Sequence, residues 1–249
     1  MMRITETVKH LLIINIIFFA GAQLIGGGEL FYDLFALYFP ENDAFKPWQI
    51  VTHMFMHGGL MHLVFNMFAL WMFGSTVEAR LGRNKFLFVY FSAGLGAILF
   101  QVGYNYFDFT GIMNDLIVSG FTKSNIIEMI TTNKVSDSVS PIQLSGLQDA
   151  FSIYNGSMVG ASGCLMGILV AFGMLNPNAE LMMLFLPIPI KAKYFIPGII
   201  LLDVISAFSG QSFFSPSNTA YLAHVGGAVV GFIIMWYWKK NSFNSFRIN

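Results

Sequence analysis

Charged side chains are scarce in this sequence, and that scarcity excludes most classes of water-soluble protein. Asp, Glu, Lys and Arg make up 10% of the 249 residues, whereas a soluble globular domain averages about 25%. Hydrophobic residues make up 55%, and the mean hydropathy is +0.65. Such a chain cannot cover its surface with polar groups in water, so much of that surface must face lipid.

Basic clusters, cysteine pairs and complete metal motifs are also missing. The net charge is zero and no basic block occurs, so we expect no nucleic-acid partner. Cys164 is the single cysteine, which permits no disulfide within the chain. His53, His57 and His62 have the spacing of metal ligands, but no His-Glu-x-x-His motif is present and no acid lies close enough in sequence to complete a site. We therefore expect neither a metal nor another cofactor.

Six apolar stretches predict an all-α, polytopic membrane bundle. About 20 mostly apolar residues are needed to cross the hydrocarbon core, and the stretches that reach or approach this length are 8–25, 60–77, 86–104, 157–175, 195–208 and 219–238. The fifth is short, about 21 Å at 1.5 Å per residue, so we expect it to thin the bilayer, to use flanking residues or to be loosely held. The run Leu181–Ile190 is too short to cross and is interrupted by prolines, so we place it at the membrane interface.

The distribution of lysine and arginine predicts the direction of the spans. Of the 13, only Lys46, Lys123 and Lys134 fall on one side, and all the others fall on the opposite side. The excess marks the cytoplasmic side, so we expect both termini in the cytoplasm, most simply at a bacterial inner membrane. The first stretch could also be a signal peptide ending in Ala20-Gly21-Ala22, but its apolar run continues through Ile25, which favours an uncleaved span.

Polar residues inside membrane spans are costly, and each one is therefore a functional hypothesis. His62 and Asn66 lie one helical turn apart near the start of the second span, while Ser162 and His224 lie near the starts of the fourth and sixth. These three spans run inward from the outside, so the four groups reach a similar depth, about 5–12 Å below the outer surface. A neutral imidazole can take the proton of a serine nucleophile, and amide and ring N–H groups can stabilise the developing oxyanion.

Small residues accompany these polar groups. Gly163 and Gly167 follow Ser162, and Gly227 and Gly231 follow His224, with the four-residue spacing that lets membrane helices approach closely. Taken alone, Ser162 could be a packing residue, and a lone histidine at the end of a span could be interfacial. The combination favours a catalytic Ser–His pair.

At these residues the sequence resembles the rhomboid family. The matching stretches are Gly160-Ala161-Ser162-Gly163, Ala223-His224-Val225-Gly226-Gly227-Ala228-Val229-Val230-Gly231, His53-Met54-Phe55-Met56-His57 with His62 and Asn66, Glu78-Ala79-Arg80-Leu81-Gly82, and Pro187-Ile188-Pro189-Ile190-Lys191-Ala192-Lys193. The resemblance covers about 48–238 within a single membrane domain of residues 1–249. The long outer loop 105–156 lies outside it, and a lid, a substrate filter or a docking site are its alternative roles.

The resemblance implies an intramembrane serine endopeptidase that cleaves transmembrane segments of membrane proteins near the outer face, without metal or cofactor. It implies Ser162 as nucleophile, His224 as general base, and His62, Asn66 and the backbone N–H of Ser162 as the oxyanion hole. Met166 departs from the family, in which many members have an aromatic residue here that packs on the catalytic histidine.

Two alternatives and the oligomeric state stay open. One alternative is a catalytically silent relative that binds and escorts membrane proteins, although such relatives typically lack the serine or the histidine. The other is a transporter or a metal-handling protein. Asp203 is the only acid inside a predicted span. We expect it to bind neighbouring helix or loop groups, or to be protonated, rather than to complete a Ser-His-Asp triad, because the resemblance implies a dyad.

Access to the serine gives further expectations. Water must reach Ser162, so we expect a polar cavity that opens outward between the second, fourth and sixth spans. The loop Ser209–Ala220, with Phe213 and Phe214, would cap the site beside the fifth span. Glu78 and Arg80 are expected to tie down the cytoplasmic end of the second span.

Overall fold

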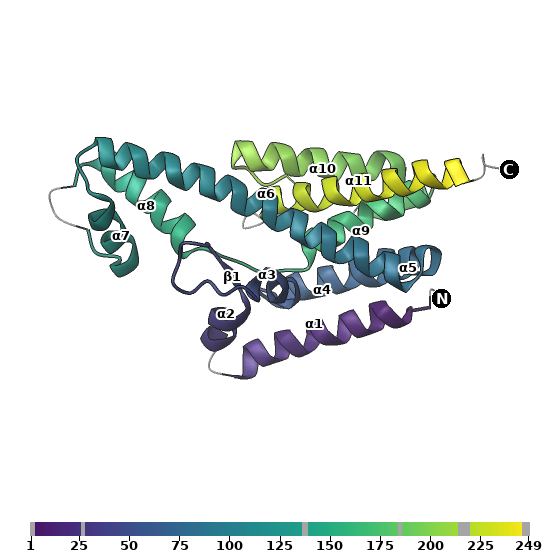
Figure 1. Ribbon diagram of the computed structural model, residues 1–249. Helices are drawn as coiled ribbons and strands as arrows, with labels where there is room; N and C mark the ends of the chain where they lie inside the picture. Colours follow the sequence, from purple (N-terminus) through teal and green to yellow (C-terminus); the bar gives the residue numbers. More distant parts are fainter. Residues whose placement is uncertain (1–2, 26–27, 136–138, 184–185, 214–219, 246–249) are drawn as a thin grey trace.

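The computed structural model describes residues 3–25, 28–135, 139–183, 186–213 and 220–245. Its long helices lie side by side, and both chain ends lie at the same end of the molecule (Figure 1). Among the described residues, five helical stretches are long and apolar enough to cross a membrane, namely Glu6–Leu24, Leu60–Leu81, Arg83–Val118, Ala192–Ser209 and Tyr221–Asn241. A shorter apolar helix, Ser162–Leu175, accompanies them. The chain is therefore a mostly helical, multi-pass membrane protein, as predicted.

The six apolar stretches occur in the predicted order. They are α1 (Glu6–Leu24), a continuous second stretch, α6 (Arg83–Val118), α9 (Ser162–Leu175), α10 (Ala192–Ser209) and α11 (Tyr221–Ser245). The second stretch consists of α4 (Leu60–Ala69), the π-helical turn η3 (Leu70–Gly74) and α5 (Ser75–Leu81).

The fifth helix includes residues that flank its predicted stretch 195–208, which is one of the expected ways to lengthen it, and the shortest of these helices is the fourth, which begins later than the predicted stretch 157–175. α10 has 18 residues, whereas α9 has 14 and begins only at Ser162. The residues before it are taken up by β2 (Ser157–Met158), which pairs antiparallel with β1 (Leu37–Tyr38). At 1.5 Å per residue α9 is about 21 Å long, so its first residue lies deeper than the ends of longer neighbours.

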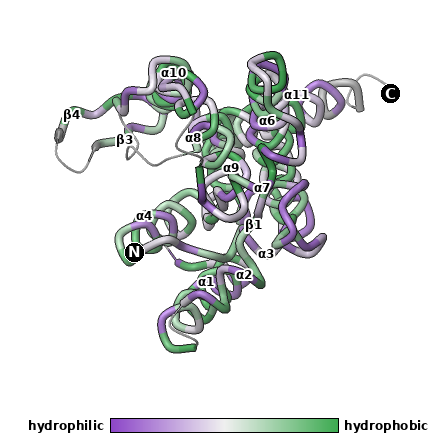
Figure 2. Tube along the Cα trace, turned by 90° about the vertical axis from the view of Figure 1, so that its left-hand side faces the viewer, coloured by the Kyte–Doolittle hydropathy of each residue, from purple (hydrophilic) through white to green (hydrophobic). Residues whose placement is uncertain are grey.

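α9 is the central helix of the bundle, and it lies near the middle when the molecule is viewed from the end opposite the termini (Figure 2). Ten of its residues are buried, from Gly163 to Phe172. Glycine permits this packing against α11, because a Cβ on Gly227 would lie 2.0 Å from the Gly163 carbonyl oxygen and one on Gly231 would lie 2.6 Å from Gly167 Cα. The two small-residue pairs therefore meet each other across the α9–α11 contact.

The outer segment 105–156, expected as a loop, is mostly helical. α6 has 36 residues, about 54 Å, and so extends well beyond a hydrocarbon core of about 30 Å. Its outer part packs with α7 (Lys123–Thr132) and α8 (Pro141–Asn155) at the left of Figure 1. These helices share a second apolar core, whose members include Phe109, Ile130 and Leu147 together with Phe39 from the first outer segment.

Short elements connect the spans at both ends. The first outer segment contains α2 (Glu29–Phe35), α3 (Gln49–Thr52) and the 3-10 turn η2 (His53–Phe55) in addition to β1. The predicted interfacial run forms a hairpin of β3 (Glu180–Met183) and β4 (Leu186–Lys191) between α9 and α10.

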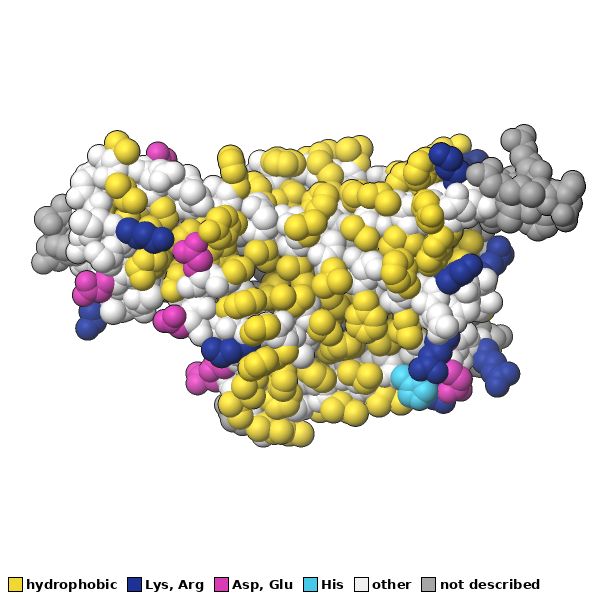
Figure 3. Space-filling model, viewed as in Figure 1, with side chains coloured by type: hydrophobic (Ala, Val, Ile, Leu, Met, Phe, Trp, Pro, Cys, Tyr) yellow, Lys and Arg dark blue, Asp and Glu magenta, His cyan; other side chains and the backbone are white. Residues whose placement is uncertain are grey.

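Glu78 and Arg80 bind other helices at the end that carries the termini, which confirms their predicted role. The Glu78 carboxylate accepts hydrogen bonds from the backbone N–H groups of Thr7 (3.1 Å) and Val8 (3.0 Å), and so caps α1. Arg80 donates to the Leu175 carbonyl at the end of α9 (3.4 Å). Figure 3 shows Lys and Arg gathered at this end and an apolar belt over the middle of the molecule.

Candidate active site

Ser162 is the first residue of α9, and the chain reaches it through a constrained glycine. Gly160 has φ +130°, a conformation that residues with a Cβ rarely adopt. Its N–H donates to the His53 carbonyl at 2.9 Å. A Cβ on Gly160 would lie 2.9 Å from Cε1 and Nε2 of His62 and 3.6 Å from Ser162 Oγ. The His62 ring and the Ser162 hydroxyl therefore both lie close to a position that only glycine fits.

The His62 ring is oriented by the turn that precedes α4. The Gly58 N–H donates to His62 Nδ1 across 3.4 Å, a long bond. A neutral imidazole that accepts at Nδ1 carries its proton on Nε2, and Nε2 and Cε1 are the ring atoms nearest to the position of a Cβ on Gly160, each 2.9 Å from it. The His57 ring packs edge-on against His62, with ring centroids 5.0 Å apart. His62 thus presents a ring N–H toward the start of α9.

Asn66 lies one turn below His62 on the same helix. Its side chain is buried, with 7% of the residue exposed. Its Nδ2 has no hydrogen-bond partner among the residues that the structure describes. Because buried amide groups are nearly always paired, this donor is one that a bound group could satisfy.

His224 lies in the first turn of α11, and the structure places Asp203 against it. Nδ1 of His224 is 2.8 Å from Oδ2 of Asp203, and the two side chains are 12% and 1% exposed. Asp203 was expected to bind neighbouring helix or loop groups or to be protonated; a group that it meets is the His224 ring of the neighbouring helix, the contact that a triad would need. Hydropathy alone gave no sign of this contact, because the relative rotation of α10 and α11 is set by packing.

Ser162 and His224 are brought near each other by the close contact of their helices. The position of a Cβ on Gly163, next to Ser162, is 3.6 Å from the carbonyl oxygen of Ala223, next to His224. No hydrogen bond between the two side chains is among those of the described residues. Catalytic hydrogen bonds of unliganded enzymes are often long and tighten when substrate binds.

Two buried, neutral histidines of the first outer segment, His53 and His57, lie beside the site. His53 Nδ1 bonds to the Gln49 carbonyl at 2.8 Å, and burial lowers the pKa of His53 to about 4. Burial, with the neighbouring His62 ring as a smaller cause, lowers the pKa of His57 to about 4. With His62 they form no cluster of metal-binding side chains, and no such group of three occurs in the described part of the chain.

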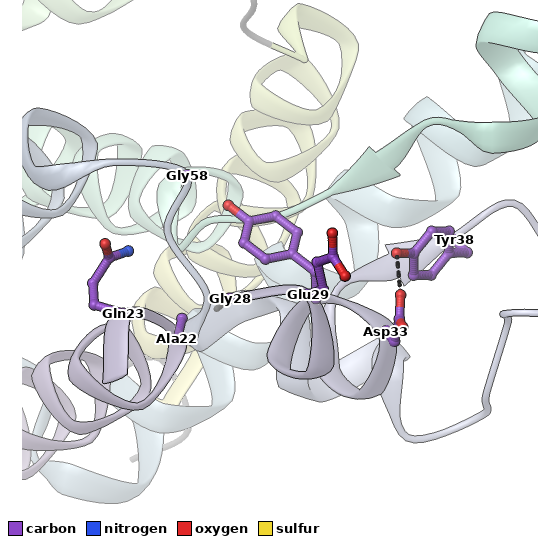
Figure 4. Close-up of a pocket in the computed structure, with 8 residues that line it drawn as sticks. Ala22, Gln23, Gly28, Glu29, Asp33, Tyr38 and Gly58 are labelled. Carbon is purple, nitrogen blue, oxygen red and sulfur yellow. Dashed lines mark hydrogen bonds between the residues drawn. The ribbon is translucent and has the colours of Figure 1, made fainter. Parts of the chain in front are cut away.

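A polar cavity of about 610 Å³ opens on the His62 side of this arrangement, between α1, α2 and the turn at Gly58 (Figure 4). Its lining includes Tyr32, Glu29 and Asp33, and Asp33 accepts a hydrogen bond from the Tyr38 hydroxyl at 3.3 Å. This cavity does not lie between the second, fourth and sixth spans, where the sequence predicted one. Phe213 of the predicted cap is 53% exposed, and Phe214 lies outside the described residues.

Comparisons with known proteins agree on one family. The family model for the Rhomboid domain matches residues 44–241. The chain is 28% identical over 203 residues to presenilin-associated rhomboid-like protein A, mitochondrial, of Danio rerio, covering 80% of this chain and 39% of that protein. It is 27% identical over 205 residues to the Homo sapiens presenilin-associated rhomboid-like protein, mitochondrial, covering 80% and 40%.

A bacterial relative is also similar. The chain is 25% identical over 197 residues to the rhomboid protease AarA of Providencia stuartii, covering 75% of this chain and 54% of the relative. The chain therefore spans between 39% and 54% of the length of these curated relatives.

Proposed function

Because the chain belongs to the rhomboid family, we propose that it is an intramembrane serine endopeptidase that cleaves transmembrane segments of other membrane proteins near their outer ends. One observation carries the proposal. The ring of His62 from α4 lies close to the hydroxyl of Ser162 at the start of α9, and α9 packs closely against α11, which carries His224 paired with Asp203 of α10. The family and the relative named as a protease support the same reading.

In the proposed reaction Ser162 Oγ attacks the scissile carbonyl while His224 Nε2 takes the hydroxyl proton. The imidazolium then gives this proton to the leaving amine, and the same base activates water to hydrolyse the acyl-enzyme. Ser162 is the first residue of α9, so its own backbone N–H has no partner within the helix and lies at the positive end of the helix dipole. With His62 and Asn66 it forms the proposed oxyanion hole.

The proposed substrate enters beside α10 and unwinds before it is cut, because a peptide bond in a regular helix is shielded by its own backbone. We expect small or helix-destabilising residues near the cleaved bond. Residues 1–249 act as a single rhomboid-like unit in this proposal, with both termini on the cytoplasmic side of a bacterial inner membrane. Phe39 joins the outer helices to the first outer segment, which supports the single unit.

The test is cleavage of a model transmembrane substrate by the purified protein. We expect Ser162→Ala and His224→Ala each to abolish cleavage, and the double variant to be no worse, because a pair that acts as a unit gives strongly non-additive losses. Thermal unfolding of each variant controls for misfolding. Additive losses would contradict a Ser–His pair.

Two further experiments distinguish the serine protease from a metal-dependent protein and from a catalytically silent escort. A serine-directed inhibitor should label Ser162, and a chelator should leave cleavage unchanged. Loss of activity in chelator that zinc restores would favour a metal-dependent protein. Stable capture of uncut substrate by the wild-type protein would favour a silent escort.

A further inference from the structure

α10 turns one stripe of residues toward the bundle, and Asp203 belongs to that stripe. The buried residues of this helix are Ala192, Ile196, Ile199, Asp203 and Ser206. Their spacing of three or four residues keeps them on one face. Asp203 itself is 0% exposed, so the carboxyl group is fixed by packing on the inner face of α10 and does not face lipid.

Burying a carboxyl group in a membrane helix is costly, which makes its partner informative. One partner of the Asp203 carboxyl is Nδ1 of His224, which lies 2.8 Å from Oδ2. In the proposed reaction the other ring nitrogen, Nε2, faces the serine. A carboxylate can only accept a hydrogen bond. The contact therefore favours the imidazole tautomer that has its proton on Nδ1.

This tautomer is the one that the reaction needs. With the proton on Nδ1, Nε2 keeps its lone pair and can take the hydroxyl proton of Ser162. When the ring becomes an imidazolium, the nearby carboxylate also stabilises its positive charge. We propose that Asp203 is a positioning residue that holds His224 in this tautomer and orientation, an inference that rests on the proposed function.

In a rival explanation, the contact between Asp203 and His224 only stabilises the packing of α10 against α11. That explanation predicts a loss of stability when Asp203 is replaced, but no change in which nitrogen of His224 carries the proton. Ser206 provides a matched control, because it lies one turn further along the same stripe, is 1% exposed, and has a hydroxyl with no hydrogen-bond partner in the described part of the chain.

The first measurement is the rate at which a small fluorophosphonate labels Ser162 in the purified full-length protein. The probe needs no unwinding and no lateral entry of a helix, so it separates the chemistry from a role of α10 at the substrate entrance. Asp203→Asn should slow labelling by more than tenfold, on the order of 10²–10⁴, since replacing the orienting Asp by Asn costs about 10⁴ in a Ser-His-Asp triad. Ser206→Ala should stay within about threefold of wild type. A loss of tenfold or less in Asp203→Asn would overturn the proposal.

The second measurement is the protonation of His224 by nitrogen NMR of histidine-labelled protein in detergent, at a pH where the ring is neutral. The His224→Gln spectrum assigns the signal among the five histidines. Wild type should carry the proton on Nδ1, and Asp203→Asn should carry it on Nε2. A wild-type proton on Nε2 would overturn the proposal even if the variant failed to fold.

The two measurements also distinguish a failure of this inference from a failure of the proposed function. If wild-type Ser162 is not labelled at all, the protease proposal fails, whatever the tautomer of His224. If wild type is labelled and Asp203→Asn is labelled at nearly the same rate, the protease proposal stands and the role of Asp203 fails.

Discussion

Mild acid should destabilise this protein through two buried histidines that lie outside the spans. His53 and His57 are 2% and 1% exposed, and burial lowers the pKa of each from 6.5 to about 4. The unfolded chain therefore binds protons below pH 6.5 that the folded chain does not bind until about pH 4. By linkage, this part of the stability is fully present above pH 6.5 and is lost as the pH falls toward 4.

The size of the loss follows from the two pKa values. At pH 5 the unfolded ring is almost fully protonated and the folded ring is mostly neutral, so each histidine costs about 2 kcal/mol. A change of 1 kcal/mol shifts the melting temperature of a chain of this size by about 2–4 °C. The two together should lower it by about 8 °C or more between pH 7.5 and pH 5.

The assay is thermal unfolding in detergent at a series of pH values, with His57→Phe as the informative variant. Both ring nitrogens of His57 lack hydrogen-bond partners among the described residues. Phenylalanine therefore removes the titrating imidazole without leaving another polar group unpaired. This variant should lose about half of the pH dependence. His10→Gln, at an exposed position of α1, is the control and should keep all of it. A His57→Phe protein with the full wild-type pH dependence would refute the reasoning.

Three other outcomes are expected. Asn66→Ala should lower turnover by about 10²–10³ and leave measurable activity, because other donors remain; an unchanged rate would remove Asn66 from the oxyanion hole. Gly160→Ala should cost about 1–3 kcal/mol of stability and most of the activity, because Gly160 has a positive φ and the new Cβ would meet the His62 ring. In the control variant Gly103→Ala the new Cβ meets nothing within 4 Å, so stability and activity should not change. Glu78→Gln should cost about 1.5–3 kcal/mol in thermal unfolding through weaker caps on α1, and the exposed Glu6→Gln should cost far less; equal losses would contradict the capping role.

Hydropathy was sufficient to predict the order of the six helical stretches, because lipid requires long apolar stretches with all backbone hydrogen bonds made internally. Hydropathy placed the start of the fourth span too early in the sequence. The residues before Ser162 are apolar enough to continue a helix, but they include β2, which pairs with β1 instead. Hydropathy also missed the helices of 105–156. These residues are polar by comparison with the spans, and their apolar face is covered by α6 and Phe39 rather than by lipid.

A similar depth for the four candidate site residues could be predicted from topology and stays a prediction, whereas their side-chain contacts could not be predicted. The rise of a helix and the direction in which a span crosses the membrane predict which residues reach a given depth. The rotation of each helix about its axis is set by packing instead. The contact of Asp203 with His224 depends on such a rotation. The position of Gly160 between His62 and Ser162 likewise depends on a backbone turn that a sequence pattern does not specify.

The order of α9 before α11 in the chain has a consequence for the synthesis of a protein with the proposed mechanism. His224 follows Ser162 by 62 residues, a stretch that a ribosome makes in about 3–12 s at about 5–20 residues per second. During that time α9 is already made, but its glycine face is not yet covered by α11 and its serine has no proposed base. Under the proposed mechanism, a nascent chain that ends before residue 221 is therefore expected to be inactive toward the proteins that are inserted beside it.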